Sequence, residues 1–222
     1  MHPRIIRNGS VKLIDHMGND LRIVNAARRS FRKESDALKG NDIGLINFLM
    51  RERHGTPFES VVFTFGVHAP VAVAREWVRH RISSWNELSG RYVELPPDFM
   101  MPQMRIQKGK PGSYTFEDIE GQESIDAEFI IQDAYDHCWS AYSRLLEMGI
   151  AKEVARYVLP VGIFTEWYWT VNARSLMNFL NLRNSPHAMK EIRDLAADIE
   201  KIFCSVLPHT AAAFQANKRV AP

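Results

Sequence analysis

Arginine side chains gather in one short stretch of the chain, at residues 75–91. Arg79, His80 and Arg81 are consecutive, and Arg75 and Arg91 lie on either side of them. Guanidinium groups bind phosphate oxygens through paired hydrogen bonds, so a cluster of this kind suits a dianionic phosphate. The same residues would equally serve as a solvated basic turn that forms ion pairs with neighbouring glutamates. The composition of the stretch does not separate these two interpretations.

Three residues at the end of this stretch could complete a phosphate site. Ser89 offers a hydroxyl, Gly90 allows close approach of the backbone, and Arg91 adds another guanidinium fork. A serine can also act as a nucleophile, but it then needs a base beside it, and the sequence shows none next to Ser89. A role as nucleophile is therefore not supported for Ser89, and a phosphate contact and a solvated turn both remain open.

A second polar stretch lies at residues 170–183. Arg174 and Asn178 are four residues apart, so on a helix they lie one turn apart on the same face. Arg183 falls near the predicted end of that helix, where a cation interacts favourably with the helix dipole. From the residues alone, Asn178 fits a polar surface position and Arg183 fits a capping cation.

Hydrophobic periodicity predicts the elements that position these two stretches. Residues 61–69 alternate as a strand should, with Val61, Phe63, Phe65 and Val67 on one face. Further strands are expected at 11–15 and 163–172, and helices at 19–30, 42–53, 70–79, 124–148, 151–158, 173–182 and 187–206.

The predicted elements define a mixed α/β (α+β) fold. No internal repeat, linker or shift in composition marks a domain boundary, so residues 1–222 are expected to form a single domain. We expect a small antiparallel-type sheet of two to four strands, flanked by long helices. Residues 101–123 are rich in Pro, Gly, Lys and Gln and predict a mobile loop. Neither a GxGxxG pattern nor a P-loop occurs among the twelve glycines, so a Rossmann-type nucleotide site is not supported.

Composition limits the class of protein further. The chain of 222 residues is 45% hydrophobic with a net charge of +2, so it can bury a sizeable core and does not call for a nucleic-acid or membrane partner. It shows no signal-peptide pattern and no apolar run long enough to span a bilayer, and we expect a soluble cytoplasmic protein. Cys138 and Cys204 lie far apart without metal-ligand spacing, so no metal site is expected and both are interpreted as reduced core residues.

Arg79, His80, Arg81 and Ser89 share their spacing with a known signature. The pattern resembles the R-H-R-x7-S signature of the flavin-dependent thymidylate synthases, and residues 86–92 (NELSGRY) strengthen the resemblance. Other segments similar to that family are 26–31 (AARRSF), 54–59 (HGTPFE), 155–160 (ARYVLP) and 170–183 (TVNARSLMNFLNLR). Together these segments cover most of residues 19–190 in the expected order.

The resemblance implies an enzyme that reductively methylates dUMP to dTMP. In the family, FAD lies in a cleft shared between subunits of a homotetramer. The resemblance further implies 5,10-methylenetetrahydrofolate as carbon donor and NADPH as the reductant of FAD, which then carries the hydride. A classical thymidylate synthase needs a cysteine nucleophile, and neither Cys138 nor Cys204 lies in a recognised catalytic setting.

The resemblance also implies which residues hold FAD. Arg174 and Asn178 would present side by side, and an asparagine supplies both donors and acceptors for a flavin or adenine edge. The implied FAD contacts are Thr56, Glu59, Arg79, His80, Arg81, Ile82, Asn86, Glu87, Asn172, Arg174, Asn178 and His187.

For dUMP, the resemblance implies that Ser89, Gly90 and Arg91 grip the 5′-phosphate. Arg183 is the expected catalytic residue, because a guanidinium beside the N3/O2 edge of uracil would favour an enolate-like pyrimidine and so activate C5. The full set of implied dUMP contacts is Glu76, Trp77, Val78, Arg79, Glu87, Leu88, Ser89, Gly90, Arg91, Arg156 and Arg183. Glu76 departs from the family, which usually has glutamine there, and a carboxylate beside a nucleotide needs an arginine or the ribose hydroxyls to accept it.

Two other interpretations remain open at this stage. The stretch 75–91 could be the basic patch of a nucleic-acid-binding module, although the net charge is near zero and no RRM, KH or helix-turn-helix pattern occurs. The chain could also be a family member that has lost catalysis and kept its assembly. Trp167, Tyr168 and Trp169 could stack a pterin or a flavin, but aromatic residues on a strand more often belong to a core or a subunit interface.

Overall fold

The computed structural model describes residues 2–222, and the contacts along this part of the chain group it into two compact units. The first unit comprises the chain up to Ser10, His68–Glu76 and Glu87–Trp167. The second unit comprises Val11–Val67, Trp77–Asn86 and Tyr168–Pro222. The basic stretch at 75–91 is therefore divided between the two units.

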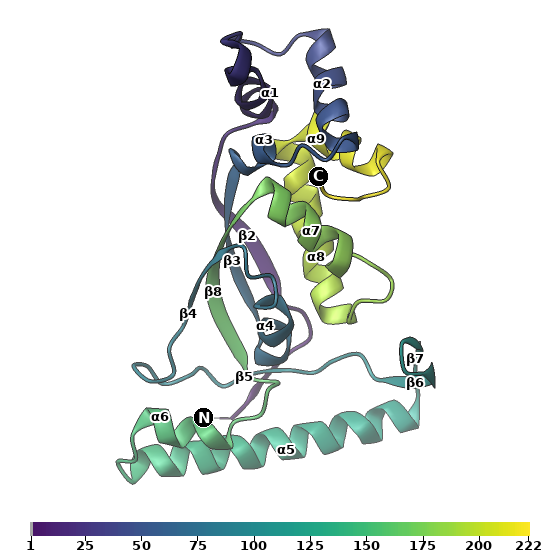
Figure 1. Ribbon diagram of the computed structural model, residues 1–222. Helices are drawn as coiled ribbons and strands as arrows, with labels where there is room; N and C mark the ends of the chain where they lie inside the picture. The colour runs from purple at the N-terminus through teal and green to yellow at the C-terminus, as the bar shows by residue number, and fades with distance from the viewer. Residues whose placement is uncertain (1) are drawn as a thin grey trace. The chain divides into compact units, whose positions relative to one another are not determined.

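Most of the predicted site segments directly follow strands of a four-stranded sheet (Figure 1). Its strands follow the order β2 (Ser10–Met17), β3 (Val62–Pro70), β8 (Phe164–Asn172) and β4 (Ser84–Glu87). β3 has the alternating burial that its sequence predicts, since Phe63, Phe65 and Val67 are buried and the residues between them are half-buried. The mixed helix-and-sheet fold expected from the sequence is confirmed.

In the described part of the chain, the second unit contains six complete α-helices, of which α7 and α8 pack against its strands. The six helices are α1 (Asp20–Arg28), α2 (Gly40–Arg51), α3 (Thr56–Glu59), α7 (Ala173–Arg183), α8 (Lys190–Val206) and α9 (Pro208–Ala216). The ring of Phe179 on α7 lies 4.8 Å from that of Trp169 on β8, and the ring of Phe203 on α8 lies 6.3 Å from that of Phe63 on β3. These aromatic contacts fix α7, which carries Arg174, Asn178 and Arg183, against the sheet.

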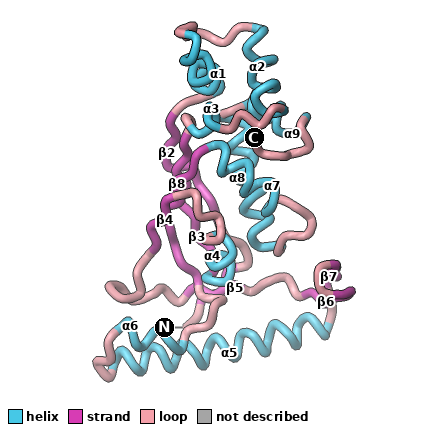
Figure 2. Tube along the Cα trace, viewed as in Figure 1, coloured by secondary structure: helices cyan, strands magenta, loops and turns pink. Residues whose placement is uncertain are grey.

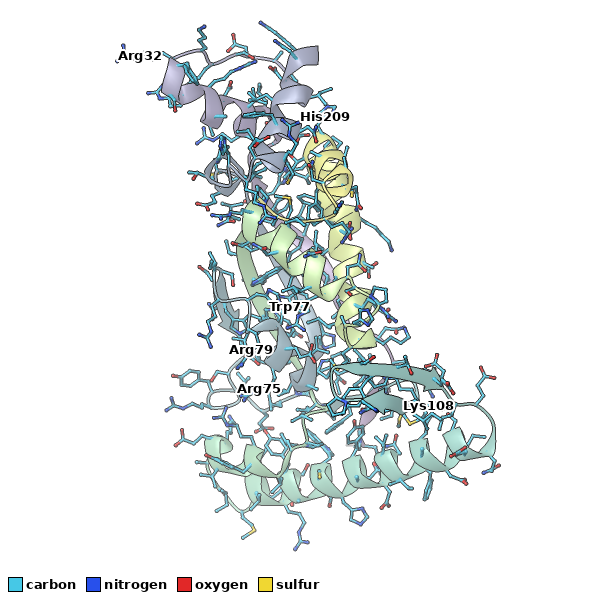
Figure 3. The ribbon with its side chains drawn as sticks, turned by 45° about the vertical axis from the view of Figure 1, so that its right-hand side comes forward. Arg32, Arg75, Trp77, Arg79, Lys108 and His209 are labelled. Atoms are coloured by element: carbon cyan, nitrogen blue, oxygen red, sulfur yellow. The ribbon has the colours of Figure 1, made fainter. Side chains whose placement is uncertain are left out.

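A buried carboxylate ties the beginning of α9 to α1. Asp20 is only 3% exposed, and its two oxygens accept hydrogen bonds from the backbone nitrogens of His209 and Thr210, each at 3.0 Å. A carboxylate is stabilised at a helix N-terminus by the free backbone donors and by the helix dipole. Figure 3 labels His209 at this end of α9.

The first unit is built around one long helix, α5 (Gln122–Glu147), drawn in teal in Figure 1. Tyr135, Trp139 and Tyr142 form its buried stripe and pack with Phe99 and Ala155. In the same unit, β1 (Arg4–Ile6) pairs in parallel with β5 (Asp98–Met100). β6 (Arg105–Lys110) and β7 (Ser113–Asp118) form a hairpin. Two short helices, α6 (Lys152–Ala155) and η2 (Arg156–Val158), complete the described elements that lie wholly within this unit. The helix α4 (Val71–Trp77) belongs to the first unit except for its last residue, Trp77, which belongs to the second.

The prediction of a mobile loop at 101–123 is wrong for its central part. β6 and β7 pair antiparallel there, and Gly112 takes the positive φ of +85° that their tight turn requires. Figure 2 draws both segments as strands. Every residue of β7, and all of β6 except Arg105, is exposed, so neither strand has the buried apolar face that makes a strand recognisable in a sequence. The short elements β1, β4, β5 and α3, and the helix α9, were also not predicted.

The prediction that both cysteines are core residues is wrong. Cys138 is partly exposed on α5 and Cys204 is exposed on α8, and neither forms a disulfide. Neither cysteine belongs to the buried stripe of its helix. Cys138 precedes the buried Trp139, and Cys204 follows the buried Phe203. Within residues 2–222, no group of His, Cys, Asp or Glu is placed to hold a metal ion, and no helix has the length and apolar character needed to cross a membrane.

Candidate functional site

The R-H-R segment follows directly from a buried anchor in the second unit. Trp77 is fully buried, and its ring lies 4.6 Å from that of Phe179 and 5.3 Å from that of Trp169. α4 ends at Trp77, and the backbone nitrogen of His80 donates to the Trp77 carbonyl at 3.0 Å, so the chain turns there. Figure 3 labels Trp77 and Arg79 on this part of the chain. The helix predicted over residues 70–79 therefore ends at Trp77, just before the R-H-R segment.

His80 and Arg183 form a direct contact, although 103 positions separate them in the sequence. The Nε of Arg183 donates to the Nε2 of His80 at 3.0 Å. The His80 ring also lies edge-on to Phe179, with 4.9 Å between the ring centroids. Burial, and to a lesser degree the charge of Arg183, lowers the pKa of His80 from 6.5 to about 4. His80 is therefore neutral near pH 7.

Arg174 is held at the other end of α7 by three groups of the same unit. Its Nη1 donates to Glu59 at 2.7 Å, and its Nε donates to the main-chain oxygen of Pro222 at 2.7 Å. A Cβ at Gly55 would lie only 2.5 Å from this Nε, so the guanidinium packs directly on the glycine. Asn172 caps the helix, since its side-chain oxygen accepts from the backbone nitrogen of Ser175 at 2.9 Å.

The predicted phosphate loop belongs to the first unit. The carbonyl of Ser89 accepts from the backbone nitrogen of Tyr92 at 3.0 Å, and its hydroxyl accepts from the backbone nitrogen of Arg91 at 3.3 Å, so residues 89–92 form a turn. Gly90 is buried in this turn, and a Cβ there would lie 3.4 Å from the Cδ of Arg156. The structure thus brings together Ser89, Gly90, Arg91 and Arg156, as the resemblance implied.

An acidic residue pairs with the arginine of this loop. The Nε of Arg91 donates to the Glu153 carboxylate on α6 at 2.9 Å, and both side chains are more than half exposed. Nearby, the hydroxyl of Thr165 donates to Glu87 at 2.7 Å. Sequence analysis found neither Glu153 nor Thr165, because their partners lie 62 and 78 positions away.

The predicted contacts divide between the two units. The second unit holds the FAD contacts Thr56, Glu59, Arg79, His80, Arg81, Ile82, Asn86, Asn172, Arg174, Asn178 and His187, and the dUMP contacts Trp77, Val78, Arg79 and Arg183. The first unit holds Glu76, Glu87, Leu88, Ser89, Gly90, Arg91 and Arg156. Since Trp77 is fully buried, its indole serves the core, and only its backbone is suited to a ligand.

The residues of the second unit have the chemistry that a flavin dinucleotide requires. Arg79 and Arg81 are exposed cations, and Asn178 is an exposed amide on the same helix as Arg174. Guanidinium forks match a diphosphate, and an amide can both donate to and accept from the edge of an adenine or a flavin. Ile82 is 74% exposed and adds an apolar surface beside the cations. The donor set therefore fits FAD.

Comparison with known proteins identifies the class. The family model described as "Thymidylate synthase complementing protein" matches residues 12–209. The curated flavin-dependent thymidylate synthase of Thermotoga neapolitana is 47% identical, over 95% of this chain and 92% of its own, and that of Tropheryma whipplei (strain TW08/27) is 42% identical, over 100% and 98%. The chain belongs to the family of the flavin-dependent thymidylate synthases.

A solved structure of the same fold extends this comparison. The chain is similar to the UMP/dUMP methylase PolB from Streptomyces cacaoi in its crystal structure with bound 5-Br UMP, with a TM-score of 0.93, 38% sequence identity and full coverage of both chains. A second structure of that methylase, with bound 5-Br dUMP, gives a TM-score of 0.91 over 98% of this chain and 99% of the other. The resemblance stated from the R-H-R-x7-S pattern is confirmed, and the protein is an enzyme of a flavin-dependent class.

Proposed function

We propose that this protein methylates dUMP to dTMP, with 5,10-methylenetetrahydrofolate as the carbon donor and NADPH as the reductant of its FAD. One observation carries the proposal within the chain. Arg183, from the polar stretch 170–183, is bonded to His80, the central residue of the R-H-R pattern. Two stretches that the resemblance assigned to one site thus meet in the second unit.

The FAD contacts implied by the resemblance are proposed for this chain. FAD supplies, when bound and reduced, the hydride that completes the new methyl group. Arg79, Arg81 and Arg174 are proposed to hold its phosphates and Asn178 to bind a ring edge. The half-buried position of Arg174, with Glu59 and Gly55 around its guanidinium, supports this assignment because the side chain is already oriented.

The substrate contacts follow the same reasoning. Ser89, Gly90, Arg91 and Arg156 are proposed to bind the 5′-phosphate, which is supported by the turn at 89–92, with its hydroxyl and one guanidinium, and by the packing of the Arg156 side chain beside Gly90. Arg183 is proposed to lie at the N3/O2 edge of uracil and to stabilise negative charge on the pyrimidine as C5 becomes nucleophilic. The remaining FAD and dUMP contacts that the resemblance implies are proposed to complete the cofactor site and the substrate site.

We further propose that residues 1–222 act as a single domain and that the enzyme is a homotetramer. The relatives it matches are covered almost from end to end, which supports one functional region. The homotetramer is carried over from the resemblance to the family.

An anaerobic assay tests this function. Purified protein should be yellow and should form dTMP from dUMP, 5,10-methylenetetrahydrofolate, FAD and NADPH, and omission of FAD or of the folate should abolish the product. Colourless protein that forms no dTMP with added FAD, and that binds RNA in a salt-sensitive manner, would favour the nucleic-acid-binding alternative instead. Yellow protein that forms no dTMP would favour a family member without catalysis.

UMP is a second candidate substrate. The structural relative PolB is named as a UMP/dUMP methylase. Glu76 supports the same possibility in this chain, because a carboxylate in place of the usual glutamine can accept a hydrogen bond from a ribose 2′-hydroxyl. The anaerobic assay with UMP in place of dUMP decides, and a preference for dUMP that is unchanged in Glu76→Gln would remove the assignment to Glu76.

A further inference from the structure

We infer that His80 is a positioning residue for Arg183, a neutral acceptor that fixes the guanidinium and leaves its positive charge intact. This inference rests on the proposed catalytic role of Arg183. It gives His80 a part in the reaction that is separate from any contact with the cofactor.

The geometry of the contact determines the state of the imidazole. An arginine Nε carries a hydrogen and can only donate, so the His80 Nε2 at 3.0 Å must be the unprotonated nitrogen. The ring proton of neutral His80 is consequently on Nδ1. Because a guanidinium is planar, holding its Nε also fixes the plane in which its two terminal nitrogens lie.

His80 is itself held in place by a contact of its ring and by two hydrogen bonds of its backbone. Its ring contacts Phe179, which is fully buried and lies four residues before Arg183 on the same face of α7. Its backbone nitrogen donates to Trp77 at 3.0 Å, and its carbonyl accepts from the hydroxyl of Ser83 at 2.8 Å. His80 therefore contacts both the arginine and the helix that carries it, which is the arrangement expected of a group that orients a side chain.

A neutral partner suits a guanidinium that must act on a developing negative charge. A carboxylate could accept the same hydrogen bond, but its negative charge would offset the field of the guanidinium at short range. The structure offers that contrast in Arg174, whose partner is Glu59. The lowered pKa of His80, about 4, keeps the imidazole uncharged at neutral pH, so this hydrogen bond does not offset the charge of Arg183.

Three substitutions of His80 separate orientation from charge. His80→Gln places an amide oxygen near the position of Nε2, His80→Glu places a charged acceptor there, and His80→Leu removes the acceptor. At saturating FAD and dUMP, we expect kcat to fall about 10²-fold in His80→Leu, because a misplacement of about 1 Å has an effect of that order. We expect His80→Gln to keep kcat within about 10-fold of the wild type, and His80→Glu to lose more than His80→Gln. A role confined to FAD binding would instead raise the Kd for FAD in all three variants and leave kcat at saturation unchanged, which would overturn the inference.

A double-mutant cycle with Arg183→Lys shows whether His80 acts through Arg183. If it does, His80→Leu should change kcat little once Arg183 is replaced, whereas a separate structural role would lower kcat by the same factor in both backgrounds and overturn the inference. Should His80→Leu fail to fold, equal kcat values for His80→Gln and His80→Glu would also overturn it. Wild-type turnover in Arg183→Lys would instead remove the catalytic role of Arg183, which is a failure of the proposed function.

A measurement that does not depend on turnover completes the test. In the wild-type protein, nitrogen-15 NMR of the histidine side chains should show His80 as the Nδ1–H tautomer near neutral pH, and this signature should change in Arg183→Lys. A His80 ring protonated on Nε2 in the wild type would overturn the inference, because that nitrogen could not then accept from Arg183.

Discussion

The two units hold their arginines in different ways. In the second unit, the Nε of Arg183 donates to the neutral imidazole of His80, and the Arg183 side chain is partly buried. In the first unit, the Nε of Arg91 donates to the carboxylate of Glu153, and the two side chains are 57% and 51% exposed.

The difference indicates two modes of ligand binding. An exposed ion pair contributes no more than about 1 kcal/mol, so Arg91 can exchange Glu153 for a phosphate at little cost. The contact between Arg183 and His80 is partly shielded from water and uses the Nε of Arg183, which is not one of its two terminal nitrogens. The second unit is thus preorganised for its ligands, whereas the first has a loop whose arginine changes partner.

The largest effect is expected for Arg183→Met. If the guanidinium stabilises negative charge on the pyrimidine, its removal should lower kcat by about 10²- to 10³-fold. Steady-state dTMP formation measures this. Arg22→Met on α1 replaces an exposed arginine outside both predicted sites and should keep wild-type turnover. A kcat for Arg183→Met equal to that of this control would show that the preorganised arginine is not catalytic.

A smaller effect is expected for Arg91→Ala, and on substrate affinity. Removing one charge-assisted contact with the phosphate should weaken dUMP binding by about 2 kcal/mol, or about 30-fold in Kd, with little change in kcat. Titration calorimetry with dUMP measures the change, and Arg144→Ala on the exposed face of α5 is the matched control.

Glu153→Gln tests the exchange of partners directly. Because it removes the competitor of the phosphate, it should lower the Kd for dUMP by a few-fold, in the direction opposite to Arg91→Ala. If Glu153→Gln weakened dUMP binding, the carboxylate would be a support for Arg91 and not a competitor, and the contrast between the two units would fail.

The sequence predicted those elements that bury one face. α1, with Asn19 as its N-cap, β3, α5, α7 and α8 occur close to the expected positions, because apolar residues recur at the period of a helix or a strand. The hairpin β6–β7 lacks such a face, and β1, β5 and α3 are too short to show a period. Cys138 and Cys204 were misplaced because residue type alone does not tell which side of a helix is buried.

The spacing of the motif residues predicted which side chains belong to the site, but not which residues they contact. The resemblance named Arg183, His80, Arg91 and Arg174, but nothing in the order of residues links His80 to Arg183 or Arg91 to Glu153. Such contacts depend on how the chain folds back over 103 and 62 positions. The close packing of Arg174 on Gly55 was missed in the same way, because it also joins two distant segments of the chain.

Gly55→Ala tests the preorganisation of Arg174 with a single methyl group. The new Cβ would lie 2.5 Å from the Nε of Arg174, so the guanidinium must move away from Glu59 and Pro222. We expect FAD affinity to fall by about 10-fold, with little loss of stability, because a flexible side chain can move. Gly44→Ala on α2, where a Cβ meets nothing within 4 Å, is the matched control and should leave FAD affinity unchanged. Equal FAD affinity in both variants would show that Arg174 is not held for the cofactor.

The smallest effect expected is on the pH dependence of the free energy of unfolding. One histidine in each unit contributes to it, and the two contributions have opposite signs. His80 has a pKa lowered from 6.5 to about 4, so between these values the unfolded chain binds more protons than the folded one, and stability falls as the pH falls. The pKa of His137 on α5 is raised, first by its hydrogen bond to the Asp133 carbonyl, so His137 adds stability at low pH that is lost as the pH rises.

Urea unfolding at neutral pH and at about pH 5 measures both signs. Compared with the wild type, His80→Gln should lose less stability on acidification, because it lacks the group that resists protonation in the folded state. His137→Gln should lose slightly more, since its histidine lies on the surface and its contribution is screened by solvent. If His80→Gln followed the wild type, the imidazole would be protonated as readily in the folded as in the unfolded chain, and it could not act as the uncharged partner that distinguishes Arg183 from Arg91.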